Sequence, residues 1–236
     1  LLAVIEADRL GQTRTGAATG VATRWLARPD ARSLAIIGTG WQARSQAQAV
    51  ATVRRLETIR AFGRDRDRLR EFCREIEFTC SVAATPCSSA EEALRGADVV
   101  VTATSSDRPV VQGAWLPPGT HINAVGSNRA DRRELDDEAV RRADLIVVDS
   151  IEQARLEAGD LLVPGAGLAG SAAALPLGLA VELKDVLSGA HPGRRGDREI
   201  TLFKSLGIGL EDLAAASLVY DLAVETGTGR PLAPGE

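Results

Sequence analysis

Short apolar runs alternate with longer amphipathic segments through most of this chain. The short runs are rich in aliphatic side chains and end in glycine or polar residues, which predicts buried strands. The longer segments repeat apolar residues at helical spacing, as Leu69, Phe72, Cys73 and Ile76 do. This alternation predicts an α/β fold with a Rossmann-type, doubly wound parallel sheet.

The same pattern sets approximate bounds for the elements. We expect strands over residues 1–10, 34–37, 58–62, 78–82, 98–102, 122–125, 145–149 and 200–204. We expect helices over residues 12–28, 44–55, 65–77, 90–95, 132–143, 177–187 and 211–226, and a long connection over residues 163–176. In the first helix, Ala18, Val21, Ala22 and Trp25 share one face, which we expect to be buried.

A glycine-rich turn lies between the strand at residues 34–37 and the helix that follows it. Gly38, Gly40 and Ala43 form the pattern G-x-G-x-x-A. Such residues allow a tight turn, close approach to a pyrophosphate and close packing of the helix on the sheet. We predict a dinucleotide site here; the alternative is a glycine turn of an ordinary strand–helix unit.

The residues after the strand at 58–62 bear on the choice of cofactor. In a Rossmann unit an acid at this place binds the ribose 2′-hydroxyl of NAD, whereas an arginine accommodates the 2′-phosphate of NADP. Arg64 follows Gly63 and favours NADP(H), although Asp65 stands directly behind it. The alternative is that Arg64 only opens the charged face of the next helix.

Arg14 and Thr15 are expected in the first turn of the first helix. An arginine there opposes the helix dipole, and an anionic ligand bound by the guanidinium, the hydroxyl and the free N–H groups would remove the conflict. A solvated arginine is the alternative.

Thr104 follows the strand expected at residues 98–102, at the edge of the sheet where ligands bind in open α/β folds. Its hydroxyl is either a ribose ligand or an ordinary strand-end group.

Composition narrows the possible functions. The chain has 236 residues and a net charge of −4, and aromatic residues make up only 3%, so we expect no binding to nucleic acid or to an anionic membrane. No apolar run is long enough to span a bilayer, and no signal peptide is visible. Cys73, Cys80 and Cys87 show no C-x-x-C pattern, and His121 and His191 show no ligand spacing; we predict no metal site and a cytoplasmic protein.

Five ordered motifs resemble one known family. They are R-T-G-A-A at residues 14–18, A-I-I-G-T-G-W-Q-A at 35–43, H-I-N-A-V-G at 121–126, R-E-L-D-D-E at 133–138 and T-L-F-K-S-L-G-I-G-L-E-D at 201–212. Together they resemble the ornithine cyclodeaminase/mu-crystallin family over essentially the whole chain. The last two segments are most similar to the mu-crystallin (ketimine reductase) branch.

The resemblance implies a homodimer that acts on small amino or imino acids with NAD(P). It implies that residues 31–150 form the NAD(P)-binding Rossmann domain, inserted in a split substrate and dimerisation domain of residues 1–30 and 151–236. Arg14 would bind the substrate carboxylate, and Thr15 would lie by the cofactor phosphates. The full set of expected cofactor-binding residues is Thr15, Gly38, Gly40, Trp41, Gln42, Ala43, Gly63, Arg64, Asp65, Thr102, Ala103, Thr104, Val125, Ser127, Leu206 and Gly207.

Two departures from the family pattern bear on function. Members have a longer N-terminal portion with a further carboxylate-binding arginine and an active-site lysine, so this chain is either a piece of a longer protein or a product that lacks part of the pocket. The cyclodeaminase branch has an aspartate where this chain has Asn128, at a position assigned to the catalytic proton chemistry. An amide cannot serve as a general base, which argues against ornithine cyclisation and leaves hydride transfer intact; Asn128 is otherwise a loop-capping amide.

We therefore expect an NADPH-dependent reductase of a C=N bond next to a carboxylate, or an amino acid dehydrogenase in reverse. Two alternatives stay open. The first is a cyclodeaminase-type lyase that releases ammonia and recycles NAD, and the second is a non-catalytic protein that binds NADPH and a small ligand.

Overall fold

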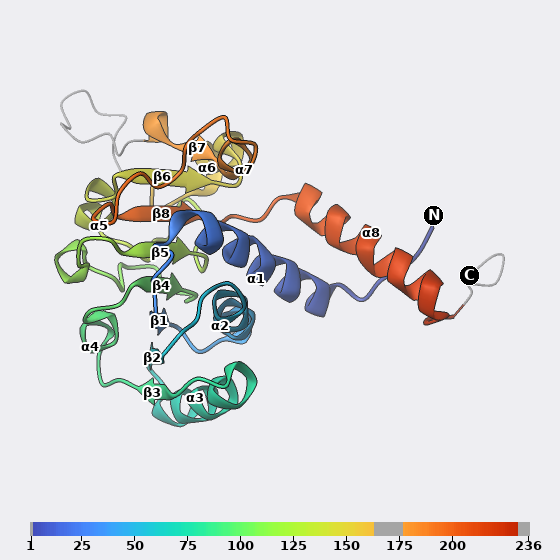
Figure 1. Cartoon of the computed structure of the whole chain (residues 1–236), viewed down its shortest axis with the longest axis horizontal. Coiled ribbons are helices and arrows are strands. Elements are labelled where there is room, and N and C mark those ends of the chain that lie inside the picture. The colour runs from blue at the N-terminus through green and yellow to red at the C-terminus, as the bar shows by residue number, and fades with distance from the viewer. Residues whose placement is uncertain (1, 163–176, 231–236) are drawn as a thin grey trace.

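The computed structural model describes residues 2–162 and 177–230, and one sheet organises them. The strands are β1 (Ser33–Ile37), β2 (Thr58–Phe62), β3 (Ala84–Pro86), β4 (Val99–Thr102), β5 (His121–Ala124), β6 (Leu145–Val148), β7 (Val181–Glu182) and β8 (Thr201–Lys204). They pair in parallel in the order β3-β2-β1-β4-β5-β8-β6-β7 (Figure 1). The α/β fold class with a parallel sheet is confirmed.

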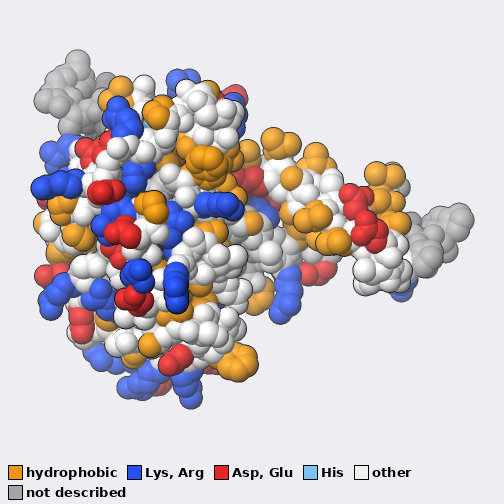
Figure 2. All heavy atoms as spheres, in the orientation of Figure 1, with side chains coloured by type: hydrophobic (Ala, Val, Ile, Leu, Met, Phe, Trp, Pro, Cys, Tyr) orange, Lys and Arg blue, Asp and Glu red, His pale blue; other side chains and the backbone are white. Residues whose placement is uncertain are grey.

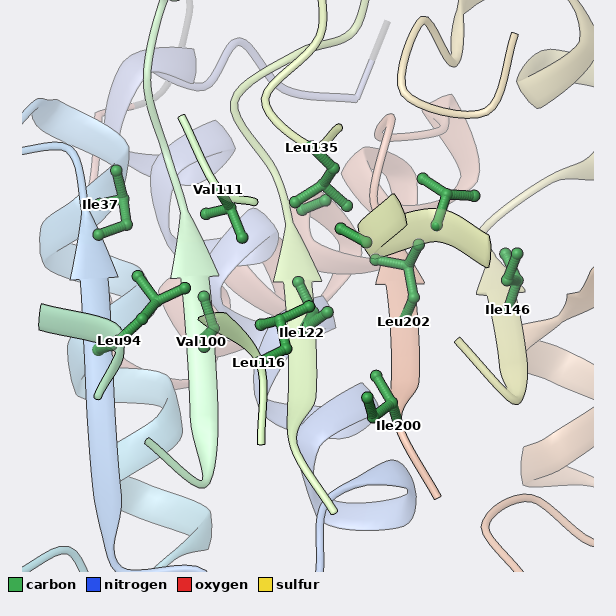
Figure 3. Packing of buried hydrophobic residues seen from close by; sticks show 14 of the residues in the cluster. Ile37, Leu94, Val100, Val111, Leu116, Ile122, Leu135, Ile146, Ile200 and Leu202 are labelled. Atoms are coloured by element: carbon green, nitrogen blue, oxygen red, sulfur yellow. The ribbon is translucent and has the colours of Figure 1, made fainter. Parts of the chain in front are cut away.

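Helices cover both faces of this sheet. They are α1 (Ala7–Leu26), α2 (Trp41–Val53), α3 (Arg66–Cys80), α4 (Ala90–Leu94), α5 (Asp137–Arg141), α6 (Ile151–Glu157), α7 (Leu183–Leu187) and α8 (Gly209–Thr226), with short 3-10 turns η1 (Gly113–Trp115) and η2 (Leu177–Leu179). α1, α2 and α3 lie on one face and α4 and α5 on the other (Figure 1). The core on the second face joins apolar side chains of β1, β4, β5 and β8 to Leu94 of α4 and to Leu135 (Figure 3).

The strand expected over residues 1–10 is wrong. α1 already begins at Ala7, and the carboxylate of Glu6 caps it by accepting a hydrogen bond from Asp8 N at 2.9 Å. A strand at this place would need a partner for its backbone groups, whereas a helix satisfies its own. The first helix is therefore longer than its apolar pattern indicated.

The buried face of α1 is also different from the expected one. Val21 and Trp25 are 38% and 51% exposed, and the buried side consists mainly of glycine and threonine. A Cβ at Gly16 would lie 2.8 Å from the carbonyl oxygen of Ser45 in α2. Small residues at this face let α1 and α2 pack closely, an arrangement that a search for large apolar residues does not detect.

Several other expectations need correction. α3 continues to Cys80, so residues 78–82 form no strand; Phe78 is 86% exposed, and the third strand is β3. The helix expected over residues 132–143 is reduced to α5, and the one expected over residues 177–187 is divided into η2, β7 and α7. The helix α6 was missed, and the connection at residues 163–176 lies outside the described residues.

Two strands from the C-terminal part complete the same sheet. β8 lies between β5 and β6, and β7 pairs with β6. Both come from the residues that the sequence assigns to a split second domain of residues 1–30 and 151–236. The division between that domain and residues 31–150 stays a prediction. Among the described residues, no helix has the length and apolarity needed to cross a membrane.

A buried polar cluster joins β5 and β8 to the end of α1. The ring nitrogens of His121 lie 2.9 Å from Thr201 Oγ1 and 3.2 Å from Asn123 Oδ1, and the Asn123 amide donates to Thr23 Oγ1 of α1 at 3.0 Å. His121 has no solvent exposure. Burial, and next the charge of Arg194, lowers the pKa of His121 from 6.5 to about 3, so this ring is neutral in the folded protein.

This neutral histidine should make the fold sensitive to acid. Below pH 6.5 the unfolded chain binds a proton at His121 that the folded protein does not bind, so stability falls as the pH falls. Between pH 7 and pH 5 the loss from this residue should be about 2 kcal/mol. Urea unfolding across this range should show a shallower pH dependence for His121→Gln than for the wild type. His191→Gln is the control, and an unchanged slope in His121→Gln would contradict the assignment.

Candidate active site

A pocket of about 580 Å³ lies at the carboxyl ends of the central strands. The strand order reverses between β1 and β4, which is where open α/β sheets form a ligand-binding crevice. The lining comprises Arg14, Thr15, Ile37, Gly38, Thr39, Gly40, Trp41, Gln42, Phe62, Gly63, Arg64, Asp65, Arg68, Ala103, Thr104, Ser105, Ser106, Val110, Val125, Gly126, Asn128, Arg132, Ser205, Leu206 and Gly207.

The glycine-rich turn forms the floor of this pocket. Gly38 has φ of +115°, and a Cβ there would lie 2.3 Å from the carbonyl oxygen of Ala103, so no other residue fits. A Cβ at Gly40 would meet nothing within 4 Å, which leaves space for a ligand against the backbone. α2 begins directly after Gly40, with no side-chain cap and no acid in its first turn. These free N–H groups fit a pyrophosphate.

Arg64, Asp65 and Arg68 lie together at one end of the pocket. The Asp65 carboxylate caps α3 by accepting hydrogen bonds from Asp67 N at 3.0 Å and Arg68 N at 3.1 Å. Arg64 and Arg68 form no ion pair with any described residue. This end of the pocket therefore presents two free guanidinium groups and an acid that is already hydrogen-bonded to backbone.

Arg14 lines the pocket on the side of α1, but not in the way that the sequence suggested. α1 begins at Ala7, so Arg14 and Thr15 lie about two turns inside the helix, and the expected anion site at free N–H groups is wrong. Instead, Arg14 Nε donates to Asp212 Oδ1 at 2.6 Å and Nη1 donates to Glu211 Oε2 at 3.2 Å. Arg14 Nη2 has no hydrogen-bond partner within the described part of the chain.

The surroundings of Arg14 fix its guanidinium. A Cβ at Gly207 would lie 2.6 Å from Arg14 Nη1, so the planar group rests against the backbone of a glycine with φ of +80°. Burial, together with the charge of Asp149, raises the pKa of Glu211, while Arg14 opposes that shift. Two acids thus hold the guanidinium of a residue that lines the pocket.

Most of the expected site residues meet in this pocket, and three lie behind its wall. Ala43 is fully buried at the base of α2, Thr102 Oγ1 donates to Glu134 Oε2 at 2.8 Å, and Ser127 Oγ donates to the carbonyl oxygen of Arg132 at 2.7 Å. The Thr104 hydroxyl lines the pocket but donates to Glu134 Oε1 at 2.7 Å.

Sequence reasoning missed several lining residues, namely Arg68, Ser105, Ser106, Arg132 and Ser205. A sequence signal existed for Arg68, because it lies four residues after Arg64, in the first turn of the helix that starts there. Asn128 and Arg132 both line the pocket because the chain between β5 and α5 folds back on itself. The spacing of apolar residues in the sequence does not predict such a loop. No group of acids, histidines and cysteines in the described residues is suited to hold a metal ion.

The sheet order and the glycine turn define the class of this protein: it has the architecture of a dinucleotide-binding α/β protein. Comparison with known proteins then identifies the family. The model of the ornithine cyclodeaminase/mu-crystallin family matches residues 1–227, and the chain belongs to that family.

Curated relatives and solved structures agree with this assignment. The chain is 41% identical to a Delta(1)-pyrroline-2-carboxylate reductase of Bacillus cereus over 229 residues, which are 97% of this chain and 69% of that protein. It is 40% identical to the ketimine reductase mu-crystallin of Mus musculus over 221 residues, 94% of this chain and 65% of that one.

Among solved structures, Thermococcus litoralis Delta(1)-pyrroline-2-carboxylate reductase, in complex with NADH and L-proline, has a TM-score of 0.89 and 38% identity, covering 96% of this chain and 69% of that one. An archaeal alanine dehydrogenase dimer with bound NAD has a TM-score of 0.86 and 33% identity, covering 96% and 68%. Nicotinamide cofactors are thus bound in related structures, and the turn after β1 fits such a group.

The two glycines of the turn should respond differently to alanine. Gly40→Ala should leave the melting temperature within about 2 °C, because its Cβ meets no protein atom, but should weaken dinucleotide binding by roughly tenfold or more by filling the space beside the pyrophosphate. Gly38→Ala should lower the melting temperature clearly. Calorimetric titration and thermal unfolding check both, and normal binding by Gly40→Ala would contradict the placement of the pyrophosphate.

Proposed function

We propose that this protein reduces a C=N bond adjacent to a carboxylate, as a ketimine or imino acid reductase, with the reverse amino acid dehydrogenation as its other direction. The observation that carries the proposal is the presence of the glycine turn and Arg14 in one pocket. A bound nicotinamide cofactor supplies the hydride. The protein's task is then to bind the acid and orient its imine carbon.

Arg14 is the residue that we assign to the substrate carboxylate. Asp212 holds its Nε and Glu211 holds its Nη1, so the guanidinium is oriented before any ligand binds; Nη2 has no hydrogen-bond partner among the described residues, and Arg14 lines the pocket. An oriented guanidinium loses little entropy on binding a carboxylate and forms charge-assisted hydrogen bonds with it. Leu206 and Gly207 support this arrangement, because Asp149 Oδ2 accepts a hydrogen bond from each of their N–H groups at 2.7 Å.

Asn128 favours reduction over cyclodeamination. It lines the pocket where the cyclodeaminase branch has an aspartate, and an amide neither ionises nor offsets a cationic intermediate. The relatives named for pyrroline-2-carboxylate and ketimine reduction support small imino acids as the substrate class. We choose a cyclic imine carrying a 2-carboxylate as the first compound to assay.

We also propose that NADP(H) is preferred over NAD(H). Arg64 and Arg68 are unpaired within the described structure and line the end of the pocket where the adenosine ribose lies in this fold. The Asp65 carboxylate, which would bind a ribose 2′-hydroxyl, is engaged as the cap of α3. Two unpaired guanidinium groups, beside a carboxylate that already accepts hydrogen bonds from the backbone, favour a 2′-phosphate over a 2′-hydroxyl.

We also propose that the protein is cytoplasmic and that it forms a homodimer. The exposed surface of α8 supports the dimer. α1 and α8 extend together beyond the sheet (Figure 1), and hydrophobic side chains cluster on α8 (Figure 2). The large exposed ones on α8 are Leu210, Leu213, Leu218, Val219, Tyr220, Leu222 and Val224. Apolar patches of this kind mark association surfaces, and one related structure is described as a dimer. Sedimentation equilibrium tests the dimer, because it should give a mass of twice the 24.8 kDa of one chain.

An assay of cofactor oxidation tests the activity. With a cyclic 2-carboxylate imine and NADPH, the wild type should turn over, whereas Arg14→Lys should lose roughly 100-fold in kcat/KM, because a flexible ammonium cannot be held by Glu211 and Asp212 and bind the carboxylate in the geometry of the planar guanidinium. NADPH affinity should change little. Arg24→Lys, on the exposed side of α1, is the matched control.

Three results would contradict this assignment. Ammonia release from ornithine without net cofactor consumption would indicate the cyclodeaminase-type lyase. Tight NADPH binding without turnover of any imine would indicate a binding protein. Full activity of Arg14→Lys would remove Arg14 from the carboxylate site.

Arg64→Ala tests the cofactor preference. Loss of a charge-assisted bond to the 2′-phosphate should raise the Kd for NADPH roughly tenfold or more and change the Kd for NADH less than about threefold. Arg66→Ala is the control, because Arg66 is exposed in the first turn of α3, two residues after Arg64, and does not line the pocket. Calorimetry with both nucleotides measures the effect, and equal losses for the two would refute the 2′-phosphate contact.

A further inference from the structure

Three charged side chains with no solvent exposure lie directly behind one wall of the pocket. They are Glu134, Asp160 and Lys204. Burying charges is unfavourable unless each is paired and hydrogen-bonded, and well-packed apolar residues usually serve stability equally well. The contacts of these three side chains therefore indicate which parts of the chain the cluster holds in place.

Glu134 ties the ends of two adjacent strands together. Its Oε1 accepts hydrogen bonds from Thr104 N and Thr104 Oγ1, both at 2.7 Å. Its Oε2 accepts from Thr102 Oγ1 and Gly126 N, both at 2.8 Å. One carboxylate thus connects the carboxyl end of β4 to the carboxyl end of β5. The approach is close: a Cβ at Gly126 would lie 2.4 Å from Thr104 N and 2.5 Å from Glu134 Oε1.

Asp160 and Lys204 hold the segment that carries Glu134. Asp160 Oδ1 accepts hydrogen bonds from Glu134 N at 2.6 Å and Leu135 N at 2.9 Å, and its Oδ2 lies 3.1 Å from Lys204 Nζ. The Lys204 ammonium also donates to the carbonyl oxygens of Ala124 and Ser127. The loop between β5 and α5 is therefore fixed at both its ends by buried charges.

The middle of this loop is fixed as well. Ser127 Oγ donates to the carbonyl oxygen of Arg132 at 2.7 Å, which closes the loop on itself. A Cβ at Gly159 would lie 2.0 Å from that same carbonyl oxygen, so the chain just before Asp160 packs directly against the loop. The exposed outer part of the loop carries Asn128, and Arg132 lies on its return.

The residues that this cluster holds face the pocket at the end away from Arg64. Thr104, Gly126, Asn128 and Arg132 all line it. A dinucleotide with its adenosine toward Arg64 and its pyrophosphate at the glycine turn would place the nicotinamide, and with it the substrate, at this opposite end. Glu134 binds Thr104 directly, and the loop that carries the other three is anchored through Glu134 and Lys204.

We propose that Glu134, held by the Asp160–Lys204 ion pair, is a positioning residue that sets the wall against which the nicotinamide and the imine are aligned. The proposal rests on the reductase function proposed above. Hydride transfer requires reacting atoms at close and defined separation, and a displacement of about 1 Å can lower the rate roughly 100-fold. A wall formed of loops acquires such precision only from supporting contacts behind it.

Glu134→Gln is the informative variant. It keeps the size of the side chain, yet in either orientation of its amide the NH₂ group faces a backbone N–H donor, from Thr104 or Gly126. Thr102→Val is the milder companion, because it removes one donor to Glu134 and keeps the shape. It also keeps the test decisive if Glu134→Gln does not fold.

Asp98→Asn is the matched control. The Asp98 carboxylate also joins neighbouring strands, accepting hydrogen bonds from Arg32 N at 2.9 Å and from Ser33 N at 3.0 Å, but at the opposite end of β4 from the pocket. A carboxylate-to-amide change there should lower the melting temperature without changing the hydride-transfer rate. It separates loss of position at the site from general loss of stability.

Two measurements on the full chain test the proposal. Single-turnover NADPH oxidation should slow roughly 100-fold in Glu134→Gln and less in Thr102→Val, while the Kd for NADPH changes less than about threefold and Asp98→Asn keeps the wild-type rate. Amide hydrogen exchange at residues 126–132 should accelerate about tenfold or more in Glu134→Gln and Thr102→Val and stay unchanged in Asp98→Asn.

The outcomes that overturn the proposal are equally definite. Wild-type exchange at residues 126–132 in both variants would show that Glu134 does not hold the loop. An equal rate loss in Asp98→Asn would show that the effect is one of stability alone. If the wild type turns over no imine, the reductase function fails, and the exchange measurement by itself decides whether Glu134 holds the wall.

Discussion

The close approach of the turns after β1 and β4 is the constraint on which the pocket depends. Gly38 and the carbonyl of Ala103 lie so near that a Cβ would be 2.3 Å from that oxygen, and only a glycine with positive φ fits there. The chain leaves β1 toward β2 on one side, while β4 continues the sheet on the other. The two connections therefore diverge above this contact and leave a crevice between them. α2 begins at once, so its free N–H groups open into that space.

A second constraint joins the two ends of the described chain. α8 has no buried residue of its own, and it lies beside α1. Arg14 of α1 bonds to Glu211 and Asp212 in the first turn of α8, across nearly the whole sequence. The orientation of the arginine at the pocket is thereby coupled to the position of a helix that extends beyond the sheet.

Local patterns predicted much of the fold, for physical reasons that also explain the errors. β2 was bounded correctly, and the apolar side of α3 was identified. The spacing of apolar residues that distinguishes a strand from a helix is contained within a short stretch of sequence. α1 was misjudged because its buried face consists of small residues that fit against Ser45, a contact visible only once both helices are placed. Its true start moved Arg14 out of the first turn and replaced the expected N–H site by a contact with α8.

The cluster behind the pocket was beyond sequence reasoning for a related reason. Glu134 lies in a stretch where the sequence predicts a helix, over residues 132–143, yet residues 132–136 are not helical and Glu134 is fully buried. Its contacts come from four separate segments: the end of β4 with Thr102 and Thr104, Gly126, Asp160 and, through Asp160, Lys204. Buried carboxylates of this kind depend on tertiary contacts, which a single sequence does not display.

The charges around the pocket indicate what kind of chemistry it suits. The protein has a net charge of −4, yet the ionisable residues lining the pocket are four arginines and one aspartate, and that aspartate, Asp65, is engaged as a helix cap. A cationic pocket attracts a dinucleotide and a carboxylate and raises their local concentration. Apart from Asp65, the described lining contains no carboxylate, histidine, cysteine or lysine. The lining therefore suits two anionic groups, a pyrophosphate at the glycine turn and, in the function that we propose, a substrate carboxylate at Arg14.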